Sequence, residues 1–333
     1  MPPRTLLLTL DAFHTLFYPR LPVPIQYAQV AQSLQFPPHF SRNNIPIADL
    51  TAKISTAFRA AYKHESATRP NFGRNVAGFG GPRVWWGNVI RGCFARIARD
   101  YCGLVDKGAG AGEVPVEVPE ELVQRLLTRF ESREGYLLYP DVEEFVARMR
   151  RWREKVRRGL YGANSGALGF ERVVIGVISN SDDRIANILN SLGVRVGPLG
   201  RTTANTAATT ADETGPDRIT PVDIDFIVTS YEAGEEKPHR QIFDFAKERA
   251  KEWVGRDGDG SLSMLKDADW SYVHVGDHYE NDYEGAIDAG WDSFLLPRDG
   301  DGPGLSDYRH GSSASVKQIQ TLTDIFPKLG IDT

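Results

Sequence analysis

Cysteine is scarce in this chain, and its scarcity excludes several structural classes. The 333 residues include only two cysteines, Cys93 and Cys102, and both fall within one predicted helical region. Two cysteines placed in this way argue against a disulfide framework and against a zinc site. A reducing compartment is consistent with such low cysteine usage.

Long hydrophobic runs are also missing. The apolar run near the N-terminus ends at Asp11 and is too short for the apolar segment of a signal peptide. No stretch approaches the roughly 20 apolar residues that are needed to cross a bilayer. We therefore expect a cytoplasmic and/or nuclear protein that has no membrane partner.

Positive charge is not in excess. The chain has 39 Lys and Arg residues against 44 Asp and Glu, so its formal net charge is -5. This balance argues against nucleic-acid binding and gives no case for an anionic membrane surface. Hydrophobic residues make up 41% of the chain and charged residues 25%, which is typical of a globular protein with one large or two modest domains. The oligomeric state stays open.

Five short apolar runs predict strands that are buried on both faces. They cover residues 5–10, 173–178, 226–229, 272–275 and 293–296. Helical patterns separate the later runs, at residues 184–192, 239–254 and 281–289. Strands that alternate with helices indicate a parallel sheet built from right-handed crossovers. The expected fold class is therefore α/β, with a Rossmann-like parallel sheet.

The pattern changes between the first and second predicted strands. A βα connection usually has about 2–6 residues, whereas this one is far longer and contains no comparable strand run. Its amphipathic segments lie at residues 25–34, 47–62, 84–101 and 120–130. We predict a helical cap domain at 21–149, inserted into a discontinuous core made of residues 1–20 and 150–333.

Three segments of the predicted core have the composition of flexible insertions. They are the Gly/Asn/Ser-rich segment 159–169, the Thr/Ala/Asp tract 201–220 and the Gly/Asp-rich segment 255–260. Such segments contain little that could be buried. A calcium loop beginning at Asp257 would need a bidentate acid where Ala268 stands, so the third segment is not an EF-hand.

Polar residues gather where the predicted strands end, which is where ligands bind in open parallel sheets. The residues at these ends are Asp11, Ser179, Asn180, Lys237, Asp277 and Asp282. Each one alone has an ordinary explanation, because Asp and Ser often cap helices and a Lys before Pro is usually a surface charge. Their occurrence at four successive strand ends indicates a single site.

The acidic residues of this set favour a metal. Asp11 follows a buried strand, where a carboxylate can be held rigidly as a covalent nucleophile. Three carboxylates in one site, those of Asp11, Asp277 and Asp282, repel one another and raise their pKa values unless a cation intervenes. Mg²⁺ takes oxygen ligands and resolves that repulsion. The sequence therefore predicts Mg²⁺ as cofactor.

Four segments resemble the ordered motifs of the haloacid dehalogenase superfamily. They are residues 10–17, 177–180, 236–238 and 275–282, and the inserted region is similar to the C1 helical cap of that superfamily. Residues 70–73, 85–86 and 229–243 are further similar to one group within it. The resemblance covers nearly the whole chain apart from the three insertions.

The resemblance implies a role for each motif residue. Asp11 would be the nucleophile, and the metal would be held by Asp11, the backbone carbonyl of Phe13 and Asp277, with Asp282 as a further ligand or a supporting partner. Lys237 would offset the charge of Asp11 and of an anionic substrate. Ser179 and a backbone N–H beside Asn180 would hold phosphate oxygens.

Phe13 departs from the phosphatase pattern. Phosphatases of this superfamily carry a second Asp two residues after the nucleophile, which protonates the leaving group and later activates water. Phe13 can do neither, and losing a positioned acid–base group typically costs about 10²–10⁴ in rate. The neighbouring His14, at a position that is usually Gly, could substitute only if its geometry fits.

Three functions therefore stay open. The first is Mg²⁺-dependent hydrolysis of a small phosphorylated substrate through an aspartyl intermediate on Asp11, weakened by Phe13. The second is the 2-haloacid dehalogenase type, whose first motif also has an aromatic residue; those enzymes use no metal, and Asp277 would repel a carboxylate substrate. The third is a catalytically impaired binding or scaffold protein. The retained nucleophile, Ser179 and Lys237 favour an enzyme.

Three other residues are expected to be structural. Trp85 and Trp86 fall in an amphipathic segment of the inserted region and should pack the cap. His274 lies within an apolar strand and is expected to be a core residue with satisfied hydrogen bonds.

Overall fold

The computed structural model of the chain contains two compact units. The core unit comprises Met1–Tyr18 and Leu138–Thr333, and the helical unit comprises Pro19–Leu137. The structure describes residues 4–38, 46–105, 117–158, 170–198, 222–256, 269–298 and 316–331. The predicted insertions 159–169 and 201–220, and residues 257–260 of the third, lie outside the described residues.

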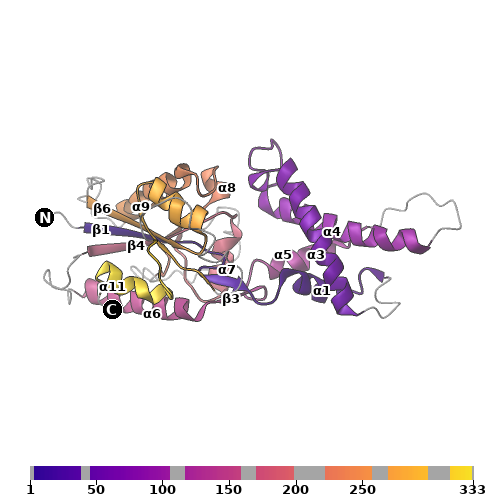
Figure 1. Ribbon diagram of the computed structural model, residues 1–333, viewed down its shortest axis with the longest axis horizontal. Helices are drawn as coiled ribbons and strands as arrows, with labels where there is room; N and C mark the ends of the chain where they lie inside the picture. The colour runs from indigo at the N-terminus through magenta and orange to yellow at the C-terminus, as the bar shows by residue number, and fades with distance from the viewer. Residues whose placement is uncertain are drawn as a thin grey trace, which may run out of the picture. The chain divides into compact units, whose positions relative to one another are not determined.

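A five-stranded parallel sheet forms the centre of the core unit (Figure 1). Its spatial order is β5-β4-β1-β6-β7, and each strand pairs in parallel with the next. The strands are β1 (Arg4–Leu10), β4 (Phe170–Ser179), β5 (Phe226–Thr229), β6 (Trp270–Gly276) and β7 (Asp292–Leu295). The predicted fold class and all five predicted strands are confirmed.

The central strand β1 sets the position of the site. Leu10, its last residue, pairs with Val177 of β4 on one side and with Val275 of β6 on the other. Leu6, Leu7 and Leu8 are fully buried, as expected for a strand covered on both faces. Because the three strands are in register, the residues that follow them emerge side by side at one edge of the sheet.

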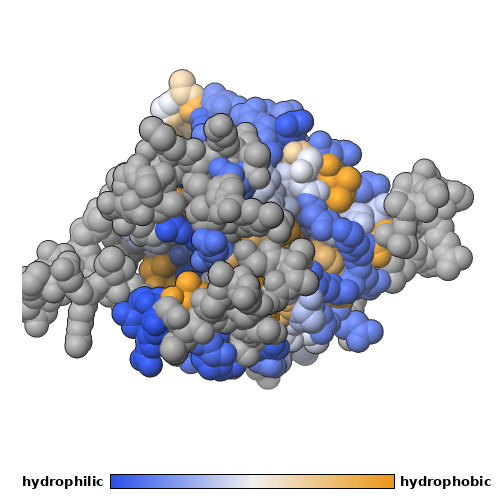
Figure 2. Space-filling model, turned by 90° about the vertical axis from the view of Figure 1, so that its left-hand side faces the viewer, coloured by the Kyte–Doolittle hydropathy of each residue, from blue (hydrophilic) through white to orange (hydrophobic). Residues whose placement is uncertain are grey.

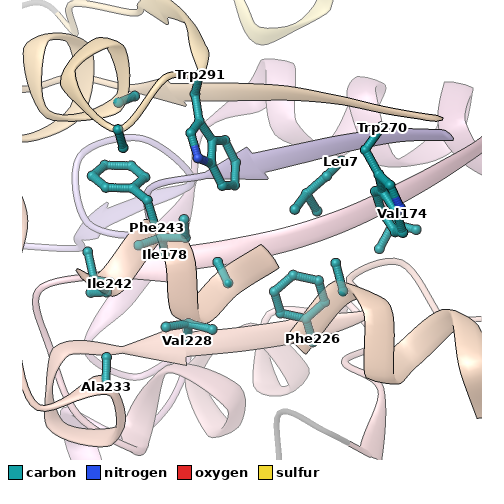
Figure 3. Packing of buried hydrophobic residues seen from close by; sticks show 14 of the residues in the cluster. Leu7, Val174, Ile178, Phe226, Val228, Ala233, Ile242, Phe243, Trp270 and Trp291 are labelled. Carbon is teal, nitrogen blue, oxygen red and sulfur yellow. The ribbon is translucent and has the colours of Figure 1, made fainter. Parts of the chain in front are cut away.

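One face of the sheet packs against α9 (Arg240–Arg256), and Figure 3 shows this cluster. Ile242 and Phe243 of α9 lie over Ile178 and Val228 of the sheet. Trp291, which follows α10 (Gly285–Asp288) in the chain, belongs to the same cluster. Figure 1 places α6 (Pro140–Arg157) and α11 (Ile325–Leu329) on the opposite face. There the rings of Phe145 and Phe326 stack with centroids 5.3 Å apart. The sheet is thus covered on both sides.

The remaining elements of the core unit are short. They are α7 (Arg184–Ser191), α8 (Ser230–Ala233), the π-helical turn η6 (Tyr279–Glu284) and the 3-10 turn η8 (Leu322–Asp324). The predicted helices at 184–192 and 239–254 are confirmed, and the one predicted at 281–289 is divided between η6 and α10. Neither α8 nor α11 was predicted, because elements this short show no helical periodicity.

The helical unit contains α1 (Val23–Ser33), α3 (Ile47–Thr68), the turn η1 (Asn71–Gly73), α4 (Gly81–Val105) and α5 (Glu120–Arg129). The four predicted amphipathic segments coincide with these helices. Aromatic rings fill its interior, where Tyr27 contacts Phe58, Phe94 and Phe130 at centroid distances of 5.4, 6.1 and 5.6 Å. Its function as a cap stays a prediction.

Two short strands lie where the chain leaves and re-enters the core unit. β2 (Phe17–Pro19) and β3 (Tyr136–Leu138) form a two-stranded sheet that the sequence pattern did not predict. The structure also differs from the predicted domain boundary at residue 149, because all of α6 belongs to the core unit. The reason is the apolar face of α6, where Phe145, Met149 and Trp152 are buried.

No helix in the described part of the chain is long and apolar enough to span a membrane. On the face of the molecule shown in Figure 2, the described residues are mostly hydrophilic, and the hydrophobic ones form separate patches.

Two buried aspartates, which lie just before β5, accept hydrogen bonds from arginines of α6. Asp223 accepts hydrogen bonds from Arg150 Nε and Nη2, both at 2.6 Å, and from the backbone N–H of Arg195 at 2.8 Å. Asp225 accepts from Arg153 Nη2 at 2.6 Å and from the backbone N–H of Ile175 at 2.7 Å. Burial opposes the charge of Asp223, but the hydrogen bonds from Arg150 and Arg195 outweigh it and lower the pKa of Asp223.

This network predicts a pH-dependent contribution to stability. We expect Asp223→Asn to lower the free energy of unfolding by about 1–3 kcal/mol near neutral pH. The loss should lie at the lower end of this range, because Arg150 is partly exposed and its charge is screened by solvent. The pKa of Asp223 is lower in the folded state, so the charge stabilises the fold at neutral pH. This stabilisation is lost as the pH falls through the folded pKa, below the ordinary aspartate value of about 3.9.

Urea denaturation of wild type and variant at about pH 7 and about pH 3 measures this effect. The difference between the two proteins should shrink at the lower pH. Asp288→Asn, at an exposed position on α10, is the control and should differ little from wild type at either pH. A difference for Asp223→Asn that is equally large at both pH values would contradict the assignment.

Candidate active site

A buried ammonium group lies at the centre of the site. Lys237 Nζ donates hydrogen bonds to Asp11 Oδ1 at 2.5 Å, to Asp282 Oδ1 at 2.6 Å and to the backbone carbonyl of Ile178 at 2.9 Å. Its side chain is only 2% exposed. Burial alone would lower the pKa of Lys237, but the charges of Asp11 and Asp282 raise it. The ammonium group therefore stays charged and joins the two carboxylates.

The side chain of Asn180 holds the main chain at Lys237. Asn180 Nδ2 donates to the carbonyl of Lys237 at 2.8 Å, and Asn180 Oδ1 accepts from the Lys237 N–H at 2.6 Å. The sequence predicted that Asn180 binds substrate and that a backbone N–H beside it holds a phosphate oxygen. Both roles stay predictions. The structure gives the Asn180 side chain a different task, which is to fix the loop that carries the ammonium group.

Three carboxylates converge on this ammonium group. Asp11, Asp277 and Asp282 each have an oxygen within 4.8 Å of those of the other two. Burial, together with the charges of Asp282 and Asp277, raises the pKa of Asp11 to about 8 in spite of Lys237. Burial and the charge of Asp282 also raise the pKa of Asp277. The cluster therefore contains more negative charge than one lysine can offset.

Asp282 differs from the other two carboxylates in its donors. Its Oδ1 accepts from Lys237 and lies 3.2 Å from His274 Nε2, and its Oδ2 accepts from the backbone N–H of His278 at 3.0 Å. Burial would raise the pKa of Asp282, but Lys237 and His274 lower it. Lys237 contacts both Asp11 and Asp282, yet their pKa values move in opposite directions, because burial and the charges of Asp282 and Asp277 raise that of Asp11, whereas Lys237 and His274 lower that of Asp282.

Gly276 makes the position of Asp282 possible. A Cβ atom added at Gly276 would lie 2.2 Å from Cγ and 2.3 Å from Oδ2 of Asp282, so no side chain fits there. The end of β6 must therefore be glycine for the carboxylate of Asp282 to lie against the backbone.

The cluster has oxygen atoms available for a hard cation. Among the described residues, Asp11 Oδ2 and Asp277 Oδ2 accept no hydrogen bond, whereas both oxygens of Asp282 accept at least one. Thr15 Oγ1 donates to the other oxygen of Asp277 at 3.0 Å. Anionic oxygens are the ligands that Mg²⁺ prefers. The donor set therefore fits Mg²⁺, with Asp11 and Asp277 offering the uncommitted oxygens; direct ligation by Asp282 stays a prediction.

The other predicted site residues lie at the same edge of the sheet. Ser179 is the last residue of β4 and is buried, directly after the Ile178 carbonyl that accepts from Lys237. The ring of Phe13 packs edge-on against Phe17, with centroids 4.9 Å apart. His14 has φ 58°, in the left-handed region that favours glycine. Phosphate binding at Ser179, metal binding by the Phe13 carbonyl and an acid role for His14 stay predictions.

Sequence reasoning missed two threonines and the polar contact of His274. Thr15 contacts Asp277, and Thr9 contacts His274 Nδ1 at 2.8 Å. A signal was present, because Thr9 and His274 are polar residues inside apolar strands, and they are direct partners in the β1–β6 register. The expectation that His274 is a satisfied core residue is confirmed.

Sequence comparison relates the chain to named hydrolases, although no family model matches it. An uncharacterized hydrolase of Schizosaccharomyces pombe is 26% identical over 287 residues, covering 86% of this chain and 88% of that protein. Haloacid dehalogenase-like hydrolase domain-containing protein 3 of Danio rerio is 27% identical over 290 residues, covering 86% and 83% of the two chains. The chain is a relative of the haloacid dehalogenase-like hydrolases. The group resemblance seen at residues 70–73, 85–86 and 229–243 agrees with this relationship.

Among solved structures, the chain aligns with a proposed haloacid dehalogenase-superfamily hydrolase from Bacillus subtilis bound to magnesium. The sequence identity is 14%, the alignment covers 99% of both chains, and the TM-score is 0.44.

The close approach at Gly276 yields a prediction for this site. Gly276→Ala should displace Asp282 from Lys237, because the added methyl group overlaps its carboxylate. We expect the free energy of unfolding to fall by about 1–3 kcal/mol, as is usual for overpacking at a buried position. Gly255→Ala is the matched control, because an added Cβ there meets nothing within 4 Å. Urea denaturation compares the two, and equal stability of both variants would refute the steric argument.

Proposed function

We propose that this chain is a Mg²⁺-dependent hydrolase that acts on a small phosphorylated substrate through an aspartyl intermediate on Asp11. The observation that carries the proposal is the contact of one buried ammonium group with Asp11 and Asp282, beside Asp277, at the carboxyl edge of a parallel sheet. The hydrolase names of its relatives agree with this reaction class.

Asp11 is the residue suited to nucleophilic attack. It directly follows the central strand, its backbone N–H donates to the Val275 carbonyl at 2.9 Å, and one carboxylate oxygen is held by Lys237. The second oxygen accepts no hydrogen bond from the described residues. Attack of the Asp11 carboxylate on phosphorus would form an O–P bond and break the bond between phosphorus and the leaving group, which departs with the bonding electron pair.

The charge of the site must be balanced before Asp11 can react. Burial and the neighbouring carboxylates raise the pKa of Asp11 to about 8, so its protonated form is favoured unless a further cation offsets the charge. Mg²⁺ held by Asp11 and Asp277 would supply the positive charge that keeps these carboxylates ionised and offsets an anionic substrate. Lys237 holds Asp11 Oδ1 in a fixed position whatever the substrate.

Phe13 limits the choice of substrate. Its ring cannot give a proton to a departing alkoxide, and it packs against Phe17. Substrates whose leaving group departs as a stable anion, such as aryl or acyl phosphates, do not need that proton. We therefore expect hydrolysis to be faster for these compounds than for alkyl phosphates.

The first prediction of this proposal concerns the metal. Calorimetry of the full chain with Mg²⁺ should show binding that is lost in Asp277→Asn. That variant removes one of the two carboxylates, Asp11 and Asp277, that offer an uncommitted oxygen to the metal. Asp288→Asn, an exposed carboxylate outside the cluster, should bind Mg²⁺ like wild type. If Asp277→Asn binds Mg²⁺ as tightly as wild type, the metal assignment is wrong.

The second prediction concerns the missing acid. Phe13→Asp should raise the rate on alkyl phosphates more than on aryl phosphates, by up to about 10²-fold where the new carboxyl group is well placed. The gain should require Mg²⁺ and disappear when Asp11→Asn is added, because the aspartyl intermediate cannot form without the Asp11 carboxylate.

Phe13→Asn is the matched control, since it removes the same ring but cannot donate a carboxyl proton. Circular dichroism and thermal unfolding first establish that both variants fold, because a polar group replaces a partly buried ring. A folded Phe13→Asp protein that is no faster than Phe13→Asn on any phosphate ester would count against the phosphatase reaction. Release of halide from a 2-haloacid by wild type without metal would point to the dehalogenase type instead.

A further inference from the structure

A buried hydrogen-bonded chain runs from Thr9, near the carboxyl end of β1, to the proposed nucleophile. Thr9 Oγ1 lies 2.8 Å from His274 Nδ1, and His274 Nε2 lies 3.2 Å from Asp282 Oδ1. Asp282 Oδ1 in turn accepts from Lys237 Nζ, which also donates to Asp11. Thr9 and His274 are both fully buried, so neither can exchange these partners for water.

The partners of His274 determine which ring nitrogen carries its proton. Asp282 is held as a carboxylate by two donors, Lys237 Nζ and the backbone N–H of His278, and has no proton of its own to give. If His274 Nε2 carried no hydrogen, two lone pairs would face each other at 3.2 Å inside the protein. A hydrogen on Nε2 removes that repulsion.

Thr9 lies at the other nitrogen of the His274 ring, Nδ1. A hydrogen on Nε2 of the neutral ring leaves Nδ1 as an acceptor, and the Thr9 hydroxyl can donate to it at 2.8 Å. The other acceptor within reach of Thr9 Oγ1, the Val273 carbonyl, is farther away at 3.4 Å. The hydroxyl therefore favours the same tautomer as the carboxylate.

The rest of the surroundings keeps the imidazole in this orientation. The ring of Phe243, from α9, meets it edge-on with centroids 5.5 Å apart. Ser293 Oγ donates to the His274 carbonyl at 3.2 Å and lies 3.4 Å from the Asp282 carbonyl, which ties the main chain of both residues to β7. The ring is thus held by packing on one side and by its main chain on the other.

We propose that His274 is a positioning residue, held by Thr9 in the Nε2–H tautomer, that donates to Asp282 and so keeps Lys237 between Asp282 and Asp11. Its kinetic consequence rests on the proposed function, whereas its tautomer does not. His274 touches neither Asp11 nor any reacting atom. It acts through Asp282, whose oxygen it shares with the ammonium group.

The tautomer is tested directly by nitrogen-15 NMR of the imidazole in the full chain. Wild type should show a protonated Nε2 and an unprotonated Nδ1 for His274, with the resonance assigned by its absence in His274→Gln. Thr9→Val should lower the population of this tautomer. Thr5→Val, at a buried threonine on the same face of β1, should leave the resonance unchanged. A proton on Nδ1 in wild type, or no response to Thr9→Val, would overturn the inference.

The positioning role is tested by paired substitutions at residue 274. His274→Phe keeps a planar ring against Phe243 but removes the donor to Asp282. The rate on an aryl phosphate should then fall about 10- to 100-fold, the range for loss of a buried hydrogen bond to a charged group. His274→Gln places an amide N–H close to the former Nε2 and should recover most of that loss. Equal rates for the Phe and Gln variants, both folded, would overturn the role.

The two tests separate failure of this inference from failure of the proposed function. If wild type hydrolyses no phosphate ester, the proposed function is wrong, and the tautomer resonance with its response to Thr9→Val alone decides the inference. If wild type is active but the resonance shows a proton on Nδ1, the proposed function stands and the inference fails.

Discussion

The candidate site depends on one ammonium group that is shared by two carboxylates inside the protein. A buried charge is costly unless it is paired and hydrogen-bonded, and Lys237 has both kinds of partner in Asp11, Asp282 and the Ile178 carbonyl. The same contact fixes three segments that are distant in sequence, which are the end of β1, the loop after α8 and the turn η6. Loss of any partner would leave an uncompensated charge, so the contact constrains all three segments together.

The uneven distribution of donors within the cluster separates its three acids by function. Asp282 is surrounded by donors and is held in the charged form, whereas Asp11 and Asp277 each have an uncommitted oxygen and a raised pKa. Pairs of acids whose environments push their pKa values apart are a common mark of catalytic sites. In this chain Asp282 organises the site, and the other two acids are those that can interact with a cation or a substrate.

Much of this arrangement is visible in the sequence, because it follows from hydrophobic pattern and position. The apolar runs predicted the strands, and the polar residues just beyond them predicted that Asp11, Lys237, Asp277 and Asp282 belong together. Contacts set by three-dimensional register were not predictable in this way. The side chain of Asn180 bonds to the backbone of Lys237, and Thr9 meets His274, because of loop geometry and strand pairing that no linear motif encodes. The two-stranded sheet β2–β3 escaped prediction for the same reason, since each strand has three residues.

The insertion of the helical unit between β1 and β4 has a consequence for the order of folding. β1 is the central strand, yet both of its neighbours, β4 and β6, lie far along the chain. Long-range strand pairing is slow because a large loop must close first. During synthesis the helical unit, which is continuous in sequence, leaves the ribosome complete while β1 still lacks both partners. The apolar leucines of β1 are thus synthesised long before the strands that cover their edges.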